Sequence, residues 1–373
     1  MAHPADVTVI GAGIIGCSIA HQLGRRGARV RLFDARAIGG GATQASAGVL
    51  APYIEAPSPG PLLDLAVRGL SLYDKFVQNV RADAGVSVEY RLCGTLEVAR
   101  DDESADRLRA AAKRLRHALG DDAVWLDASA ARAAEPSLPK ESRGGLLVRR
   151  HGYVVASQLT EALTWAALRH GVEIETRRTV VAIQENSTRL DVVTDDGERW
   201  SSDYVVVAAG SWTSQLGISE PAARAVRPIR GQLLRLAWQG DPLRAIIWGP
   251  DCYVVPWIEG SVLVGATVED VGYDERTTAA GVRALLDAVC ALLPDAWRST
   301  FIEARAGLRP ATSDGLPVLG MSNETRNLVF ATGHYRNGVL LAAITANLVA
   351  DGILESRWDP ILKDFQPARF RIT

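Results

Sequence analysis

A glycine-rich hexapeptide near the start of the chain constrains the fold more than any other feature of the sequence. Residues 6–10 form a short apolar, β-branched run that predicts a buried strand, and residues 14–26 have helical spacing that ends at Gly27. Residues 29–33 then alternate as a second strand. The hexapeptide joins the first strand to the helix and consists of Gly11, Ala12, Gly13, Ile14, Ile15 and Gly16. This order predicts one βαβ unit of roughly 30 residues.

The spacing of the glycines and of the next acidic residue indicates a dinucleotide site. Gly11 permits a tight turn, Gly13 lets backbone N–H groups approach a pyrophosphate, and Gly16 allows the helix to pack closely on the strand. The N-terminus of the helix carries positive potential that favours phosphate groups. Asp34 follows Gly16 by 18 residues, where a carboxylate accepts hydrogen bonds from ribose hydroxyls. The unit predicts dinucleotide binding but does not distinguish FAD from NAD.

Length and composition favour a globular protein of about two domains without a nucleic-acid partner. The chain has 373 residues, of which 47% are hydrophobic and 23% charged, and its net charge is −2 with no basic run. No signal-peptide pattern opens it and no stretch reaches about 18 apolar residues, so we expect no membrane span and a cytoplasmic protein. The four cysteines include no C-x-x-C pair, which predicts reduced thiols and no metal site.

The patterns along the rest of the chain predict a mixed α/β fold with a discontinuous second domain. Helical spacing covers residues 62–80, 103–119, 159–170 and 279–293. Extended runs typical of an antiparallel sheet cover residues 231–236, 253–257 and 262–264. We expect a Rossmann-like FAD/NAD(P)-binding domain at residues 1–80, 150–225 and 305–373. An antiparallel-sheet substrate domain is expected at residues 81–149 and 226–304.

Three later segments favour FAD, because each is expected where a long cofactor lies buried along its length. Residues 39–52 form a Gly/Ala/Ser-rich loop, which we interpret as lying against a ligand, although a flexible linker has the same composition. Residues 204–210 form a strand and turn. Residues 331–339 form another strand–glycine–helix junction, whose helix N-terminus either places donors on the flavin pyrimidine carbonyl or is an ordinary helix start.

These segments, taken in order, resemble the glycine oxidase branch of the D-amino-acid oxidase flavoproteins over nearly the whole chain. The resemblance is carried by Gly11 to Gly16 with Asp34, Ala45-Ser46-Ala47-Gly48, Gly231-Gln232-Leu233, Tyr253-Val254-Val255-Pro256, Gly265-Ala266-Thr267, Gly307-Leu308-Arg309-Pro310 with Asp314-Gly315, and Gly333-His334-Tyr335-Arg336-Asn337-Gly338. It implies non-covalent FAD and a p-hydroxybenzoate-hydroxylase-like, glutathione-reductase-2 type fold. It also implies oxidation of glycine, sarcosine and small D-amino acids by hydride transfer from Cα to flavin N5. The products are then an imine, which hydrolyses to a 2-oxo acid and ammonia or serves thiamine thiazole synthesis, and hydrogen peroxide.

The same resemblance assigns roles to individual residues. Arg309 matches the arginine that binds the substrate carboxylate, and Arg336 matches a second arginine near the pocket. Tyr253 matches the tyrosine that assists Arg309, with a core aromatic residue as the alternative. Val180 stands where the family binds adenine through a valine backbone. The residues expected to bind the cofactor are Gly11, Gly13, Ile14, Ile15, Gly16, Asp34, Ala35, Thr43, Ala45, Ser46, Ala47, Gly48, Val180, Ala209, Gly210, Trp212, Gly333, His334, Tyr335, Arg336, Asn337 and Gly338.

Elementary chemistry supports the role of Arg309 and leaves one alternative. A buried guanidinium needs a partner, and an α-carboxylate offers bidentate geometry, but a structural pair with Asp314 would also satisfy it. His334 suits a structural or flavin-contacting role better than that of a base. The sequence departs from the family pattern at Asp251 and Val268, where a bacterial relative has His and Met.

Two other functions are compatible with these sequence features. One is a dehydrogenase that passes electrons to a quinone or carrier, and the other is a flavin-binding protein without turnover. The expected partners are a small amino-acid substrate and dioxygen, with no nucleic acid and no membrane. The sequence is compatible with a homo-oligomer and does not specify one.

Overall fold

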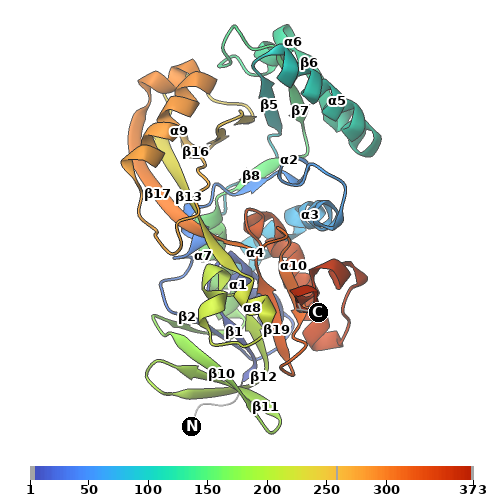
Figure 1. Ribbon diagram of the computed structural model, residues 1–373, viewed down its shortest axis with the longest axis vertical. Helices are drawn as coiled ribbons and strands as arrows, with labels where there is room; N and C mark the ends of the chain where they lie inside the picture. Colours follow the sequence, from blue (N-terminus) through green and yellow to red (C-terminus); the bar gives the residue numbers. More distant parts are fainter. Residues whose placement is uncertain (1–4, 258, 371–373) are drawn as a thin grey trace.

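A mixed sheet with a parallel centre, in one half of the molecule, contains the predicted βαβ unit. The computed structural model describes residues 5–257 and 259–370. Within them, β1 (Ala5–Ile10) pairs in parallel with β2 (Val30–Asp34) on one side and with β12 (Arg199–Val207) on the other. The other strands of this sheet are β9 (Glu173–Thr176), β10 (Val180–Asn186), β11 (Arg189–Thr194), β18 (Val318–Met321) and β19 (Leu328–Thr332). The predicted βαβ unit and the Rossmann-like class are thereby confirmed (Figure 1, lower half).

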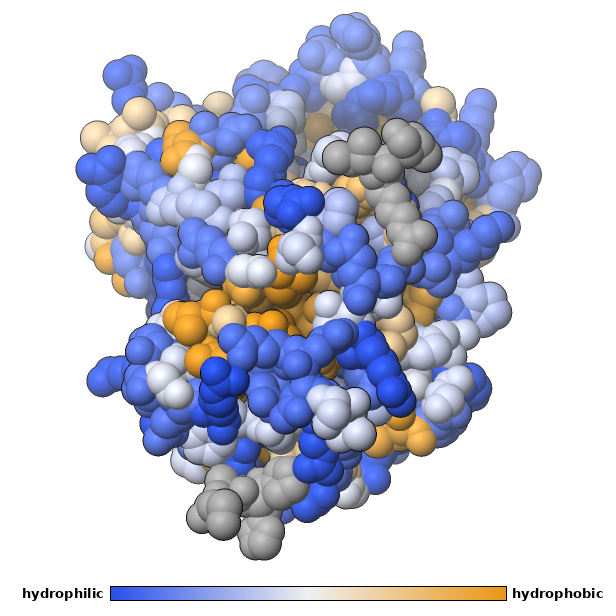
Figure 2. Space-filling model, turned by 60° about the horizontal axis from the view of Figure 1, so that its bottom comes forward, coloured by the Kyte–Doolittle hydropathy of each residue, from blue (hydrophilic) through white to orange (hydrophobic). Residues whose placement is uncertain are grey.

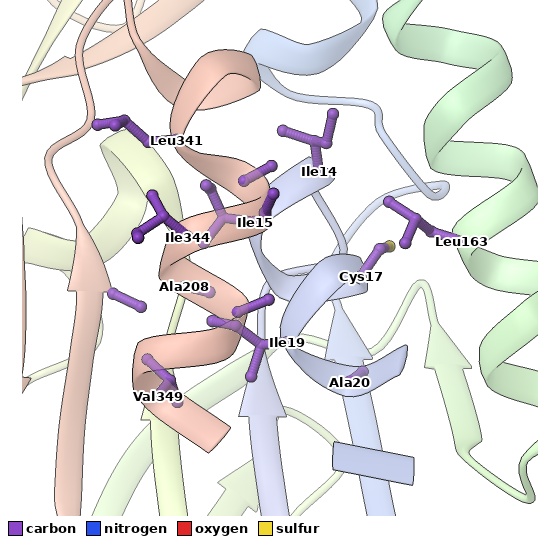
Figure 3. Packing of buried hydrophobic residues seen from close by; sticks show 14 of the residues in the cluster. Ile14, Ile15, Cys17, Ile19, Ala20, Leu163, Ala208, Leu341, Ile344 and Val349 are labelled. Carbon is purple, nitrogen blue, oxygen red and sulfur yellow. The ribbon is translucent and has the colours of Figure 1, made fainter. Parts of the chain in front are cut away.

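Helix α1 forms the centre of the core on one face of this sheet. It spans Ile14–Arg25 and lies between α10 (Gly338–Glu355) and α7 (Ala156–Arg169). Figure 3 shows Ile15 on the α10 side of α1 and Cys17 on the α7 side. Helix α10 is long and apolar enough to cross a membrane by length and composition alone, but 72% of that stretch is buried inside the protein. Its apolar composition is therefore accounted for by packing in the core.

A second, mostly antiparallel sheet occupies the other half (Figure 1, upper half). Its strands run in the order β17-β13-β16-β15-β14-β5-β7-β6, and only the β14–β5 pair is parallel among the described residues. The bounds are β17 Thr300–Ala311, β13 Arg227–Ala237, β16 Ser261–Gly265, β15 Tyr253–Pro256, β14 Ile246–Trp248, β5 Thr95–Ala99, β7 Gly144–Val148 and β6 Ala123–Asp127. The predicted extended runs lie in β13, β15 and β16.

A small three-stranded sheet and several helices complete the two halves. The small sheet consists of β3 (Val49–Leu50), β8 (Gly152–Val154) and β4 (Tyr90–Arg91). The other α-helices are α2 Pro52–Glu55, α3 Pro61–Ser71, α4 Tyr73–Ala84, α5 Asp102–Leu119, α6 Ala128–Ala134, α8 Pro221–Arg224 and α9 Ala279–Leu292. The 3-10 helices are η1 Ala42–Ala45, η2 Gly120–Asp122, η3 Gly210–Gln215, η4 Pro294–Arg298, η5 Pro360–Phe365 and η6 Pro367–Phe370.

Two expectations about boundaries differ from the structure. The helix expected at residues 62–80 is two helices, α3 and α4, which meet at Leu72. The next residue, Tyr73, is fully buried and its hydroxyl donates to the Val339 carbonyl oxygen at 2.5 Å, so tertiary packing decides the break. Strand β17 runs unbroken across the boundary expected at residue 305, and we therefore propose that the substrate domain extends to Ala311. Residues 1–4 and 371–373 of the expected ranges lie outside the described residues.

Apolar side chains are unevenly distributed over the surface. Figure 2 shows them gathered in a band across the middle of one face, with hydrophilic residues above and below. An apolar band with hydrophilic residues on both sides is suited to contact with a ligand or another apolar surface.

Candidate functional site

A cavity of about 530 Å³ brings together most of the residues that the sequence predicts. It extends from the end of β2 past the β1–α1 turn to the antiparallel sheet. The predicted residues that line it are Gly11, Gly13, Ile14, Ile15, Asp34, Ala35, Thr43, Ala45, Ser46, Ala47, Gly48, Val180, Ala209, Gly210, Trp212, Tyr253, Arg309, His334, Tyr335, Arg336 and Gly338. Gly16, Gly333 and Asn337 are not in the lining. Asp251 and Val268 are exposed and also lie outside it.

The glycines of the β1–α1 turn create the close approaches that the motif requires. Gly11 has φ +107°, and a Cβ there would collide with the carbonyl of Ala208. A Cβ on Gly16 would collide with the Gly11 carbonyl oxygen, so this glycine packs α1 onto the turn rather than facing the cavity. Gly48 has φ +71° and lies against the backbone of Val154. A side chain at any of these three positions would collide with neighbouring backbone, so the turn and the loop after it require glycine there.

The Asp34 side chain, at the end of β2, contacts the β1–α1 turn. Its Oδ2 accepts a hydrogen bond from the Ala12 N–H at 2.6 Å, and its Oδ1 accepts one from the Arg36 N–H at 2.7 Å. Burial raises the pKa of the carboxyl group, and these two donors oppose the shift. The carboxylate therefore faces the cavity from a fixed position.

A loop of the antiparallel half crosses the same end of the cavity. Glu275 pairs with Arg36 at 2.8 Å, and the Arg36 guanidinium lies 4.1 Å from the ring centroid of Trp212. The Tyr273 hydroxyl donates to the Ser211 carbonyl oxygen at 3.0 Å. Sequence patterns did not indicate Arg36, Tyr273 or Glu275, because they meet only when the two halves pack together.

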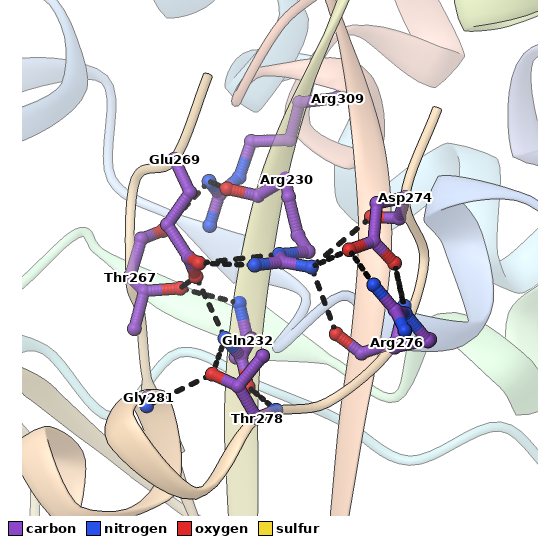
Figure 4. Close-up of polar contacts among 9 residues, drawn as sticks. All are labelled: Arg230, Gln232, Thr267, Glu269, Asp274, Arg276, Thr278, Gly281 and Arg309. Atoms are coloured by element: carbon purple, nitrogen blue, oxygen red, sulfur yellow. Dashed lines mark hydrogen bonds and ion pairs between the residues drawn. The ribbon is translucent and has the colours of Figure 1, made fainter. Parts of the chain in front are cut away.

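Arg309 points into the opposite end of the cavity without a carboxylate partner. Among the described residues, its Nη1 donates to the carbonyl oxygens of Thr267 at 2.9 Å and Arg230 at 3.4 Å (Figure 4), and no acidic side chain lies within ion-pair distance. Asp314 instead pairs with Arg369 at 2.7 Å, so the structural Arg309–Asp314 pair is wrong. Burial lowers the pKa of Arg309, yet a guanidinium keeps its proton at neutral pH. Arg309 is thus a partly buried cation with capacity for an anion.

A polar network beside Arg309 engages two carboxylates, those of Glu269 and Asp274, with other partners. Glu269 accepts from Arg230 at 2.6 Å and from Gln232 at 2.8 Å, and Asp274 pairs with Arg230 at 3.0 Å (Figure 4). The Thr267 hydroxyl also donates to Glu269 at 2.5 Å, which fixes the segment whose carbonyl holds Arg309. Arg230 and Arg276 therefore pair with these carboxylates, and Arg309 has no carboxylate partner among the described residues.

Two glycines of the predicted motifs make room for the catalytic candidates. A Cβ on Gly231 would overlap the Arg309 guanidinium, so the side chain of Arg309 lies flat across β13 at this position. A Cβ on Gly265 would come within 2.5 Å of the Tyr253 hydroxyl oxygen. Tyr253 also stacks on Trp248 with ring centroids 4.8 Å apart, and burial raises the pKa of its phenol, which therefore stays protonated. Tyr253 lines the cavity, so it is more than a core aromatic residue.

Glu55 is a cavity residue that sequence patterns did not indicate. Its carboxylate pairs with Arg336 at 3.0 Å, and its side chain is only 11% exposed. Burial raises its pKa, while the positive charges of Arg336 and Arg309 lower it. Arg336 is consequently already paired, whereas Arg309 is not.

His334 does not have the properties of a general base. Its Nε2 lies 3.1 Å from the Thr345 hydroxyl, and burial lowers its pKa to about 3. The imidazole is therefore neutral and engaged within the protein.

Comparison with known proteins places the chain in a family. The model of the FAD-dependent oxidoreductase (DAO) family matches residues 6–352, and the chain belongs to this family. It is 33% identical to glycine oxidase of Geobacillus kaustophilus over 94% of this chain and 93% of that protein. It is 36% identical to the bifunctional protein ThiO/ThiG of Nostoc sp. over 98% of this chain, which spans about half (55%) of that protein.

Solved structures agree with this assignment. The crystal structure of glycine oxidase from Geobacillus kaustophilus superposes with a TM-score of 0.93 at 31% identity and covers 100% of both chains. That of iminodiacetate oxidase from Chelativorans sp. BNC1 gives 0.88 at 27% identity and covers 97% of this chain and 98% of that one. The predicted family, fold class, enzyme class and cofactor, FAD, are confirmed.

Proposed function

We propose that the chain oxidises the Cα–N bond of a small α-amino acid, such as glycine, sarcosine or a small D-amino acid, with dioxygen as electron acceptor. The observation that carries this proposal is Arg309, a partly buried guanidinium that has no carboxylate partner among the described residues and lines the cavity that also contains the dinucleotide turn. An α-carboxylate has the charge and the planar geometry to fill that position. The likeness to the ThiO part of ThiO/ThiG supports a supply of the imine to thiamine thiazole synthesis in the cytoplasm.

The residues that line the cavity fit non-covalently bound FAD. Gly11, Gly13 and the N-terminus of α1 would hold the pyrophosphate, Asp34 the ribose, and the backbone of Val180 the adenine. The remaining predicted residues would follow the cofactor along loop 43–48 and turn 209–212. The junction that ends at Gly338 would direct the N-terminus of α10 at the flavin. Bound FAD supplies a two-electron acceptor for the hydride of the substrate Cα, and its reoxidation by dioxygen gives hydrogen peroxide.

The protein contributes mainly substrate orientation. Arg309 and the protonated Tyr253 hydroxyl would bind the substrate carboxylate, which fixes the direction of the Cα–H bond. The neutral and engaged His334 leaves proton removal to the solvent, so the amine is expected to bind in its neutral form. Arg336 and Glu55 together add no net charge to the cavity. The site is therefore matched to substrates with a single carboxylate.

A peroxide-release screen tests the proposed function. Purified protein that contains FAD is expected to release hydrogen peroxide with at least one of glycine, sarcosine, D-alanine and D-proline. Anaerobic addition of the same compound should bleach the flavin absorbance near 450 nm. Bleaching and reduction of an electron-accepting dye without peroxide would instead indicate a dehydrogenase, and the absence of bleaching by any of these amino acids would contradict amino-acid oxidation.

Gly231→Ala is expected to raise the KM of the best substrate by roughly 10- to 100-fold, because the added methyl group displaces the Arg309 guanidinium. Flavin content should stay unchanged, since Gly231 does not line the cavity. Steady-state kinetics and the flavin-to-protein absorbance ratio measure both effects. Arg235→Ala on the same strand serves as the control, because Arg235 pairs with Glu259 and lies outside the cavity lining. An unchanged KM in Gly231→Ala would show that Arg309 is not held in this way.

Glu55→Gln is expected to favour substrates with two carboxylates. Loss of the carboxylate leaves Arg336 without its ion-pair partner, and a second substrate carboxylate can take that place. The ratio of kcat/KM for iminodiacetate to that for sarcosine should rise about tenfold or more, since a hydrogen bond to a charged group contributes roughly 1.5–3 kcal/mol. Glu355→Gln, which loses an exposed ion pair with Arg26, is the control. A ratio equal to that of the unmodified protein would contradict the pairing proposed for Arg336.

A further inference from the structure

Three potential metal ligands, one buried and two partly exposed, converge in the FAD-binding half, outside the lining of the cavity. His21 lies on α1, Asp83 on α4, and His170 directly follows α7. His21 Nε2 lies 2.8 Å and His170 Nε2 3.2 Å from the same oxygen, Asp83 Oδ2. All three atoms lie within 4.8 Å of one another. None of the three residues lines the cavity of the proposed active site.

Three nitrogens crowd around this oxygen, but hydrogen bonding satisfies only one of the two imidazoles. The Arg25 Nε lies 3.2 Å from Asp83 Oδ2, in addition to the two imidazole nitrogens. Of the two imidazoles, His21 makes a hydrogen bond to this oxygen at 2.8 Å. His170 Nε2 is buried and makes no hydrogen bond within the part of the chain that the structure describes. An ordinary hydrogen-bond network therefore does not account for this arrangement.

We propose that His21, Asp83 and His170 form a binding site for a late first-row divalent cation, of which Zn²⁺ is the best match. Neutral imidazole nitrogens and a carboxylate oxygen are ligands that zinc prefers, at about 2.0–2.2 Å each. Bonds of that length in a tetrahedron place ligand atoms about 3.4 Å apart. The two distances of 2.8 and 3.2 Å are close to this spacing. A water molecule would complete the four ligands.

Arg25 is the competitor of the cation. Its guanidinium occupies one side of Asp83 Oδ2, and its side chain is 38% exposed, so it can turn into solvent when the cation binds. His170 can adjust as well, because its side chain is 31% exposed. His21 is 3% exposed and provides the rigid ligand. The cation would join α1, α4 and α7 at their C-terminal ends, where His21, Asp83 and His170 lie.

Zinc titration of the untagged holoenzyme tests this site. After treatment with EDTA and desalting, isothermal titration with zinc sulfate should show one Zn²⁺ per chain, and saturating zinc should raise the Tm by a few degrees. His170→Ala should weaken zinc binding at least about tenfold without loss of flavin or of the far-UV circular dichroism spectrum. Arg25→Gln should bind zinc more tightly than the unmodified protein, because the competing cation is gone. His117→Ala, which removes an exposed histidine on α5, should leave the affinity unchanged.

The outcomes separate a built site from incidental zinc binding. Zinc binding that weakens in His170→Ala and strengthens in Arg25→Gln supports the proposal. No binding to the unmodified protein, or equal binding by His170→Ala, would overturn it. An affinity in Arg25→Gln that is no higher than in the unmodified protein would also contradict coordination by Asp83 Oδ2.

Discussion

Arg309→Ala is expected to raise the KM of the best amino-acid substrate by roughly 30-fold to several thousand-fold while FAD stays bound. The loss corresponds to about 2–5 kcal/mol, which is the usual effect of removing one partner of a buried, hydrogen-bonded charge pair. Arg309 is partly buried in the cavity and carries no carboxylate partner among the described residues, whereas Arg336 is paired with Glu55. Steady-state kinetics give the KM, and absorbance near 450 nm gives the flavin content.

Two further variants make the Arg309 experiment specific. Arg309→Lys keeps the charge but loses the planar fork, so its KM should lie between those of Arg309→Ala and the unmodified protein. Arg227→Ala removes a half-exposed arginine that pairs with Asp270 on the surface, and its kinetics should be unchanged. If the KM of Arg309→Ala equals that of the unmodified enzyme, Arg309 does not bind the substrate.

Asp34→Ala is expected to weaken FAD binding by about 10- to 100-fold, because a hydrogen bond to a charged group contributes roughly 1.5–3 kcal/mol. The variant loses the proposed ribose contact and also the two hydrogen bonds that the carboxylate accepts from Ala12 and Arg36. Titration of the apoprotein with FAD, followed by quenching of flavin fluorescence, measures the dissociation constant.

Asp34→Ala also removes the two hydrogen bonds from Ala12 and Arg36, and two further variants control for this effect. Asp34→Asn retains an acceptor for one backbone N–H and should bind FAD with intermediate affinity. Asp6→Ala, at the start of β1, loses the ion pair with the Arg29 side chain and the hydrogen bond from the Arg29 N–H, and should bind FAD normally. Full flavin occupancy in Asp34→Ala at limiting FAD would refute the role of this carboxylate in ribose binding.

Features whose cause is local in the sequence were predictable. The βαβ unit depends on a buried strand, a glycine turn and a helix that follow one another, and it was found where the motif lies. The Gly231 motif was recognised, but its physical reason was not, because it depends on the register of β13 with β17 that brings Arg309 across Gly231. The sequence therefore predicted the Gly231 motif but not the contact between Gly231 and Arg309.

Features that arise from tertiary contacts were missed. Glu55 lies 281 residues from Arg336 in the chain, and Arg36 lies 239 from Glu275, so no short motif contains either pair. The proposed zinc ligands His21, Asp83 and His170 also come from separate parts of the chain and have no recognisable spacing, while the expectation of no metal site, which came from cysteine spacing, stays a prediction. The break at Leu72 likewise depends on the burial of Tyr73 against a helix at the other end of the chain.

The loop that carries Tyr273 and Glu275 affects how the holoenzyme gains and loses FAD. If FAD binds as proposed, contacts with Arg36 and Ser211 hold this loop of the antiparallel half over the adenine end. Binding and release of FAD then require these two contacts to break, whereas amino acids exchange at the opposite end of the cavity while the contacts remain. Flavin exchange would accordingly be slow, temperature-sensitive and independent of turnover.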